Sequence, residues 1–293
     1  MKVLAFDIGG TTIKGGLVDE NLKIKEKFIE DTPKREDTFL TLIEEIHDRF
    51  SDETDIVSLG MPGFVDNDNY IFKYGTNMKF SIDFKKLGFA KEKKIYLEND
   101  GNLAAYSEYL SHFKNDYKNL IMLTFGTGVG GGIIYNSEIF KGSGNAGEIG
   151  RILINEKSYL EDVISAKAWT KKCQELYEIN KETKLSNIFY EEKVGSLLFD
   201  RSIDLEDYEK YARDEIIQNT SNALISLFEL FDNDIFVIGG SMTKSPYDFI
   251  PLIDEYISKN FEFPNRSFPK IKLSKAREDS GMLGAALLAL NSE

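Results

Sequence analysis

Three short glycine-rich segments carry the residues with the clearest potential for chemistry. Residues 9–12 read Gly-Gly-Thr-Thr, residues 126–128 read Gly-Thr-Gly, and residues 239–241 read Gly-Gly-Ser. Glycine permits positive φ angles and close backbone approach, so that consecutive N–H groups can face one anion, and hydroxyl groups add further donors. Each segment follows an apolar run typical of a buried strand. α/β proteins usually bind their ligands at the ends of such strands. A single such turn is more simply a hairpin, but three together favour phosphate binding.

The middle segment also matches the spacing of a dinucleotide-binding fingerprint. Residues 126–131 read Gly-Thr-Gly-Val-Gly-Gly after an apolar run. That fingerprint needs a helix directly after it, whose N-terminus faces the pyrophosphate. Here a further glycine and the Ile-Ile-Tyr of residues 133–135 follow, which is typical of a strand. A nicotinamide-dependent oxidoreductase is therefore the second hypothesis.

A candidate proton acceptor lies at Asp100, where a predicted strand ends and a predicted helix begins. Asn and Asp are favoured at such junctions because they cap free N–H groups. The same position also lets a carboxylate project from the edge of a sheet. On the residues alone, the capping interpretation is favoured.

Metal and disulfide chemistry have few candidate residues in this chain. The one cysteine, Cys173, rules out an internal disulfide and a thiolate metal cluster. His47 and His112 both lie in patterns typical of helix faces, so we interpret them as structural.

Composition limits the remaining classes of protein. Hydrophobic residues make up 42% of the 293 residues and charged residues 29%, which is an ordinary folded mixture. The formal net charge of −13 does not favour nucleic acid as a partner. The first apolar run ends at Asp7, too early for a signal peptide, and no run reaches the length of a membrane span. We therefore expect a cytoplasmic protein without membrane contact.

The elements that must position these residues form two predicted α/β lobes, over 1–117 and 118–293. The first has predicted strands at 3–8, 13–18, 23–28, 56–59 and about 95–97, with helices at 37–50 and 102–113. The second has predicted strands at 120–125, 133–135 and 235–238, with helices at 160–177 and 207–231 and a C-terminal helix over about 280–293 that can pack back on the first lobe. Alternating strands and helices predict parallel pairing with crossover helices.

A short internal sequence repeat occurs once near the start of each predicted lobe. Residues 7–12 (Asp-Ile-Gly-Gly-Thr-Thr) and 124–129 (Thr-Phe-Gly-Thr-Gly-Val) are both glycine turns between strands. The repetition indicates two related lobes that face each other.

Taken in order, the motifs resemble the ROK family of sugar kinases and repressors, within the actin-like ATPase superfamily. They lie at residues 7–11, 62–63, 98–102, 126–131, 147–150 and 238–240, and cover nearly the whole chain. The resemblance implies an actin-like ATPase (ribonuclease H-like) fold with two five-stranded sheets and a nucleotide and sugar cleft between the lobes. It also implies a homodimer. The chain starts on its first strand, without the DNA-binding domain of the family's repressors, which favours an enzyme.

The resemblance also implies roles for individual residues. Asp100 would be the catalytic base, and Asp7 would hold Mg²⁺, through water. The phosphates and adenosine of ATP would lie along Asp7, Gly9, Gly10, Thr11, Thr12, Lys14, Thr127, Gly128, Gly239 and Gly240. The sugar would contact Gly63, Asn77, Asn99, Asp100, Glu148 and Glu161. A solvated strand residue explains Lys14 equally well, and a surface turn explains Asn77 equally well.

The sequence departs from the family pattern after residue 150. Arg151 stands where the family has a histidine, and residues 152–159 lack the family's zinc-binding cysteines, so no zinc is expected. Zinc-free relatives include N-acetylmannosamine and β-glucoside kinases. The expected reaction is ATP-dependent phosphorylation of a hexose or N-acetylhexosamine, at the 6-hydroxyl. N-acetylmannosamine is the first choice, and glucose, fructose and β-glucosides are alternatives. A non-catalytic sugar sensor is a third class, against which Asp100 argues.

Overall fold

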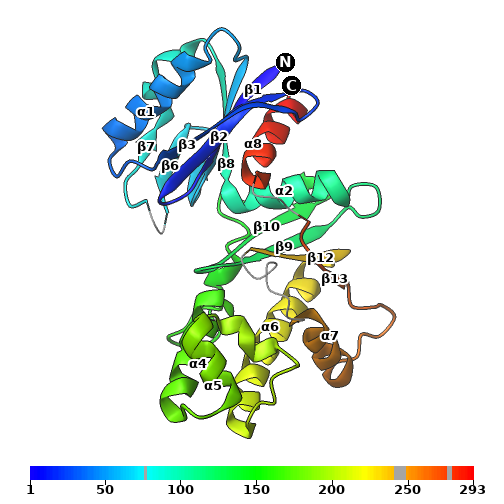
Figure 1. The fold of residues 1–293 in the computed structure, drawn as a ribbon. Helices are drawn as coiled ribbons and strands as arrows, with labels where there is room; N and C mark the ends of the chain where they lie inside the picture. Colours follow the sequence, from blue (N-terminus) through cyan, green and yellow to red (C-terminus); the bar gives the residue numbers. More distant parts are fainter. Residues whose placement is uncertain (76–77, 241–248, 276–278) are drawn as a thin grey trace.

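The computed structural model describes residues 1–75, 78–240, 249–275 and 279–293. Two lobes each contain a five-stranded sheet, and the chain passes from the first lobe to the second and back at its C-terminal end (Figure 1). Among the described residues, no helix combines the length and apolar character needed to cross a lipid bilayer.

The first sheet combines an antiparallel half with a parallel half. Its strands are β1 (Lys2–Ile8), β2 (Thr12–Asp19), β3 (Ile24–Asp31), β4 (Ile56–Met61) and β8 (Lys94–Asn99), in the spatial order β3-β2-β1-β4-β8. β1, β2 and β3 pair antiparallel, whereas β4 pairs parallel with both β1 and β8. Helix α1 (Glu36–Arg49) buries Phe39, Ile43 and Ile46 against this sheet, as its apolar spacing predicts.

The second sheet repeats this arrangement. It contains β9 (Leu120–Phe125), β10 (Val129–Tyr135), β11 (Glu138–Ile139), β12 (Ile235–Gly240) and β13 (Lys270–Leu273), in the order β11-β10-β9-β12-β13. β9, β10 and β11 pair antiparallel, and β12 pairs parallel with β9 and β13. The matching topology confirms that the two glycine turns belong to related lobes.

Helices of the second lobe enclose a large apolar core. They are α3 (Glu161–Ile164), α4 (Ala166–Ile179), α5 (Lys184–Glu192), α6 (Asp207–Phe231) and α7 (Phe249–Asn260), with short 3-10 turns at η3 (Ile149–Arg151) and η4 (Gly195–Phe199). The rings of Phe125, Trp169 and Phe249 pack together in this core. The single helix predicted at 160–177 was wrong: the backbone of Ser165 is extended, and its hydroxyl caps α4 by accepting the N–H of Ala168.

Two helices cross between the lobes. α2 (Asp100–His112) follows β8 of the first sheet, yet its Ala105 and Tyr109 pack with Met122 and Val237 of the second sheet. α8 (Ser280–Asn291) follows the second sheet, yet it packs against β1 and β4 of the first. The two helices also contact each other (Figure 1). Each sheet is thus covered on one face by a helix that follows a strand of the other sheet in the sequence.

A small third sheet was not predicted. It consists of β5 (Phe64–Asp66), β6 (Ile71–Tyr74) and β7 (Ile82–Asp83), in sequential antiparallel order, followed by 3-10 turns η1 (Phe84–Lys86) and η2 (Gly88–Lys91). Strands of two to four residues are too short to show a clear alternation of apolar and polar residues. This sheet follows β4 directly.

The second glycine turn is shorter than the sequence indicates. β10 begins at Val129, so that Gly130, Gly131 and Gly132 are strand residues rather than turn residues. A Cβ at Gly132 would lie 2.6 Å from the carbonyl oxygen of Gly101, which shows that the start of α2 packs directly on this strand. Because a strand and not a helix follows residues 126–128, the turn lacks the context of a dinucleotide-binding fingerprint.

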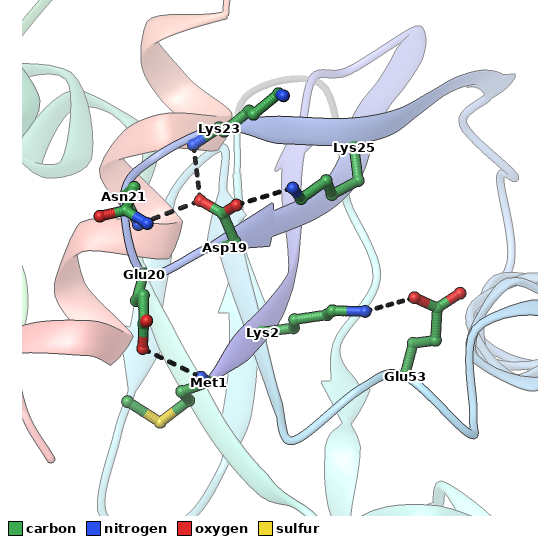
Figure 2. A network of polar contacts seen from close by, with 8 residues as sticks. All are labelled: Met1, Lys2, Asp19, Glu20, Asn21, Lys23, Lys25 and Glu53. Atoms are coloured by element: carbon green, nitrogen blue, oxygen red, sulfur yellow. Dashed lines mark hydrogen bonds and ion pairs between the residues drawn. The ribbon is translucent and has the colours of Figure 1, made fainter.

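Asp19 organises the turn between β2 and β3, at the end of the first sheet that lies away from the glycine turn at 9–12 (Figure 2). Its Oδ1 accepts the N–H groups of Asn21 and Lys23 at 3.0 Å each, and its Oδ2 lies 3.0 Å from Nζ of Lys25. The Lys25 ammonium, followed by the backbone N–H of Lys23, lowers the pKa of the half-buried Asp19 carboxyl group. This network stabilises a hairpin on the surface.

Candidate active site

The parallel strands of the first sheet bring Asp7 and Asp100 to the same edge. Asp7 pairs in register with Gly60 of β4, and Gly60 pairs with Glu98 of β8. β8 then ends at Asn99, and α2 begins at Asp100. The carboxyl edge of a parallel sheet is the usual position of a ligand site in such folds.

Asp100 is the titratable group whose environment is most suited to a base. Burial of its carboxyl group, followed by the negative charge of Asp7, raises its pKa from 3.8 to about 7, and Glu148 adds to the increase. One carboxylate oxygen accepts the N–H of Gly101 at 2.8 Å. The helix N-cap itself is Asn99, whose Oδ1 accepts the N–H of Asn102 at 3.1 Å. The capping role that the sequence allowed for Asp100 therefore belongs to its neighbour.

Asp7 lies against the start of α8. A Cβ at Gly281 would come within 2.5 Å of the Asp7 carboxylate, so that only glycine leaves space there. Burial raises the pKa of Asp7, and Lys14, opposite it on β2, lowers this pKa in part. In the part of the chain that the structure describes, no donor is hydrogen-bonded to the Asp7 carboxylate. A partly buried carboxylate without a protein partner fits a hard cation that retains its waters.

The first glycine turn is closed by a hydrogen bond from the N–H of Gly9 to the carbonyl oxygen of Thr12, at 2.9 Å. Thr32 Oγ1 donates to the carbonyl oxygen of Gly9 at 2.7 Å, and Lys34 Nζ donates to that of Gly10 at 2.5 Å. The side chains of Thr11 and Lys14 are exposed, and Thr12 is half-buried. Carbonyl groups are therefore bound within the lobe, while the hydroxyl groups remain accessible.

The second turn is also closed by a backbone hydrogen bond, but over one residue fewer, from the N–H of Gly126 to the carbonyl oxygen of Gly128 at 3.0 Å. Gly9, Gly126 and Gly128 do not have positive φ angles, so the expectation that these turns need glycine for its backbone conformation was wrong. A Cβ at Gly128 would lie 2.4 Å from Oε2 of Glu161, whereas a Cβ at Gly126 would meet no atom within 4 Å, and Thr127 between them is exposed. Open space at a strand end is what an approaching ligand requires.

The third glycine segment lies beside the second. Gly239 and Gly240 pair in register with Thr124 and Phe125, directly before residues 126–128. Gly240 has a φ angle of 89°, and a Cβ there would lie 2.3 Å from the carbonyl oxygen of Phe125. Close strand contact and backbone conformation therefore both require glycine at this position.

The candidate sugar residues come from both lobes. Electrostatic interactions connect Asp100 with Glu148 and Glu148 with Glu161. Glu161 Oε2 lies near the second glycine turn, where it accepts the N–H of Val129 at 3.4 Å. Asn99 Nδ2 donates to the carbonyl oxygen of Gly63 at 3.2 Å. Each of these two hydrogen bonds lies within one lobe, and the interaction of Asp100 with Glu148 is the one named here that crosses from one lobe to the other. Asn77 lies outside the described residues.

Arg151 is placed beside this group of carboxylates. Partial desolvation raises the pKa of Glu148, Arg151 lowers it, and Glu161 raises it. The guanidinium lies 4.3 Å from the centre of the Tyr159 ring, across a hairpin closed by the hydrogen bond from Leu160 N–H to the carbonyl oxygen of Ile152, at 2.8 Å. The hairpin occupies the segment where the family pattern has zinc-binding cysteines.

The structural interpretation of histidine and cysteine agrees with their surroundings. His47 is buried in α1 and stacks on Phe89 with ring centres 3.9 Å apart, His112 ends α2, and Cys173 is buried in the core of the second lobe. Within residues 1–75, 78–240, 249–275 and 279–293, no group of three or more His, Cys, Asp or Glu residues is arranged to hold a metal ion.

Several residues near the site were missed by sequence reasoning. Glu98 and Asn102 lie within a quoted motif but received no role, although a hydrogen bond of 3.0 Å joins them. Lys141 pairs with Glu98 at 2.8 Å, and nothing in its local sequence indicates this. Gly281 also received no role; its contact with Asp7 depends on the return of the chain to the first lobe.

Comparison with known proteins agrees with this geometry. The sequence matches the ROK family over residues 3–292. It is 27% identical to a glucokinase from Thermotoga maritima, covering 98% of this chain and 96% of that protein, and 26% identical to an N-acetylmannosamine kinase from Haemophilus influenzae, covering 98% and 94%. Its fold is similar to that of a ROK family glucokinase from Streptomyces griseus in complex with glucose and AMPPNP, with a TM-score of 0.77, 22% identity, and 98% and 99% of the two chains covered.

The chain belongs to the ROK family. It has the two-lobed actin-like ATPase fold and is an enzyme of the carbohydrate kinase class.

Proposed function

We propose that the protein transfers the γ-phosphoryl group of ATP to the 6-hydroxyl of a hexose or an N-acetylhexosamine. The observation that carries this proposal is the buried carboxyl group of Asp100, which follows β8 at the same end of the first sheet as Asp7 and whose pKa is raised to about 7 by burial and by the charges of Asp7 and Glu148. The contact between Glu161 and the turn at 126–128 joins the candidate sugar residues to the second phosphate turn. Among the residues that the structure describes, no comparable group of side chains supports hydride transfer.

In this mechanism Asp100 accepts the proton of the sugar hydroxyl as that oxygen attacks the γ-phosphorus. A base whose pKa lies near neutrality combines a substantial ionised fraction with useful proton affinity. Asn99, Glu148 and Glu161 orient the sugar by hydrogen bonds to its other hydroxyl groups. Thr11, Thr12 and Thr127 donate to phosphate oxygens, and Gly239 and Gly240 leave room for the adenosine.

Asp7 would hold Mg²⁺ in this function, through retained water. When bound, the ion would neutralise charge on the phosphates that a net acidic protein does not itself neutralise. Activity should therefore disappear on chelation with EDTA and return with added Mg²⁺. We also propose that the enzyme needs no zinc, because Arg151 and Tyr159 occupy the segment of the zinc motif. Elemental analysis that finds about one zinc per chain would contradict this part of the proposal.

N-acetylmannosamine is the first substrate that we propose. The zinc-free segment at 152–159 and the 26% identity to an N-acetylmannosamine kinase support it. Glucose is the main alternative, supported by the 27% identity to a glucokinase. Fructose and β-glucosides follow.

A panel assay tests the function directly. ATP consumption is measured with N-acetylmannosamine, N-acetylglucosamine, glucose, fructose and a β-glucoside, with and without Mg²⁺. We expect one sugar to give a kcat/KM well above the others and ATP hydrolysis without sugar to be much slower. Absence of sugar-dependent turnover with every compound would overturn the proposal and favour a sugar-sensing protein. A homodimer in the cytoplasm is the proposed state of the enzyme, and light scattering on the purified protein tests the dimer.

A further inference from the structure

Glu98, the penultimate residue of β8, is a buried carboxylate with two hydrogen-bond donors on one oxygen and an ammonium group beside the other. Only 3% of the residue is exposed. Its Oε1 accepts the N–H of Asn99 at 2.9 Å and Nδ2 of Asn102 at 3.0 Å, and its Oε2 lies 2.8 Å from Nζ of Lys141. Glu98 therefore fixes the start of α2, where Asn99 and Asp100 lie, and ties it to a residue of the second lobe.

Lys141 begins the loop that ends at Glu148. Its carbonyl oxygen accepts the N–H groups of Gly144 at 2.8 Å and Ala146 at 3.2 Å, which folds the loop over its own first residue. Gly142, Gly144 and Gly147 have φ angles of 55°, 106° and 93°, a backbone region that disfavours other residues. The loop has a specific conformation, and Lys141 fastens its base to the first lobe.

A second contact with the first lobe lies further along the same loop. A Cβ at Gly144 would lie 3.0 Å from the ring of Phe64 and from the carbonyl oxygen of Val65, so the loop packs closely against β5. Two attachment points therefore set the position of Glu148 relative to Asp100.

We infer that Glu98 and Lys141 are positioning residues, whose ion pair sets the distance between Asp100 and Glu148 and thereby the placement of the sugar hydroxyl. The inference rests on the proposed function of this site. Lys141 is half-exposed, whereas Glu98 is buried, so that removal of the ammonium leaves a buried negative charge uncompensated and favours rearrangement of its surroundings. Because neither residue belongs to the candidate phosphate turns, loss of the pair should affect the sugar far more than ATP.

The test compares Lys141→Met, Lys141→Arg, Glu98→Gln and the double variant Glu98→Gln/Lys141→Met. For Lys141→Met we expect at least a tenfold loss of kcat/KM for the sugar, with a KM for ATP within about twofold of wild type. Lys141→Arg keeps the charge and should recover most of the activity. The double variant should be no worse than Lys141→Met alone, because both changes break one interaction.

Lys25→Met is the matched control. It removes the ion pair with Asp19 at the far end of the first sheet, and its side-chain exposure of 42% is close to the 41% of Lys141. It should leave both KM values and kcat unchanged. Equal losses in Lys25→Met and Lys141→Met, or a loss for ATP as large as that for the sugar, would overturn the inference.

Hydrogen exchange supplies a readout that does not depend on turnover. In Lys141→Met, amides of residues 99–102 and 141–148 should exchange faster than in wild type, while β9 and β12 stay protected. Unchanged exchange in both segments would overturn the inference even in an inactive protein. A wild-type enzyme that phosphorylates no sugar overturns the proposed function instead, so the two failures are distinguishable.

Discussion

Asp19 and Asp100 lie near opposite ends of the first sheet and show opposite effects of environment on one side-chain type. Asp19 accepts two backbone N–H groups and pairs with Lys25 on the surface, and its pKa is lowered (Figure 2). Asp100 is desolvated, lies near two other carboxylates, and has its pKa raised to about 7. Asp19 therefore stabilises a turn as an anion, whereas Asp100 is held where ionisation is unfavourable.

The contrast between Asp19 and Asp100 indicates which carboxylates serve the fold and which are candidates for chemistry. A carboxylate that is fully satisfied by donors and water serves the fold, and its removal has small, local effects. A carboxylate that is buried near like charges, with one backbone donor as Asp100 has, is costly for the fold, and such costs are typical of functional sites.

The largest expected effect comes from Asp100→Asn. Loss of the proton acceptor should lower kcat for sugar phosphorylation by roughly 10²- to 10⁴-fold, because base catalysis acts in the transition state. Binding of ATP, measured by calorimetry, should change little. Asp19→Asn is the control and should keep wild-type kcat; a fully active Asp100→Asn enzyme would remove Asp100 from the mechanism.

The second prediction concerns the pH dependence of kcat/KM. Since the base must be ionised, kcat/KM should fall below the pKa of about 7, roughly tenfold for each pH unit. Glu148→Gln removes one of the negative charges that raise this pKa, so the acid limb of its profile should move to lower pH. Asp19→Asn should leave the limb in place. An acid limb near pH 4 in wild type would contradict the perturbed pKa.

The third prediction concerns the stability of the folded protein, which the ionised Asp100 carboxylate should lower. The folded pKa of Asp100 lies above its unfolded value of 3.8, so its ionisation destabilises the folded protein as pH rises from about 4 to about 7. At pH 8, Asp100→Asn should be more stable than wild type by at most about 4 kcal/mol, since one pKa unit corresponds to about 1.4 kcal/mol. Thermal denaturation at pH 8 and pH 5 tests this. The gain should shrink at pH 5, and a gain of equal size at both values would point to a cause other than ionisation.

The smallest effect belongs to Asp19→Asn. Its lowered folded pKa means that its contribution to stability is present above about pH 4 and is lost as the pH falls further. We expect a slightly lower Tm at pH 7, and the difference should diminish at 1 M salt, because exposed ion pairs are screened. A Tm loss that salt does not change would assign the effect to the two backbone hydrogen bonds instead of the Lys25 pair.

Sequence reasoning was most successful where apolar patterns are long. The strands at 3–8 and 120–125 and the helix at 207–231 match β1, β9 and α6 within one residue. The strand that follows the glycine turn, β10, was predicted in type but placed four residues late, because its first glycines were assigned to the turn. α5, α7 and the third sheet were missed, since they are short or lie between better-defined signals.

Some residues of the candidate site could likewise be predicted from the sequence, and others could not. Asp7, Asn99 and Asp100 could be found because each lies at the end of a recognisable strand. The raised pKa of Asp100 could not, because it depends on burial and on the charges of Asp7 and Glu148, all of which arise only in the fold. Glu98 and Lys141 were missed for the same reason: an ion pair between distant segments leaves no local pattern.

The crossing of α2 and α8 has a consequence for any attempt to divide the molecule. A fragment that ends at residue 117 retains α2, whose apolar side packs with Met122 and Val237, and lacks α8, which covers Val3, Ala5 and Ile56. The complementary fragment has the converse deficit. Each piece would therefore expose two apolar surfaces and tend to aggregate when expressed alone. Mixed during refolding, the two pieces present matching surfaces, so fragment complementation should recover a folded, two-chain form of the protein.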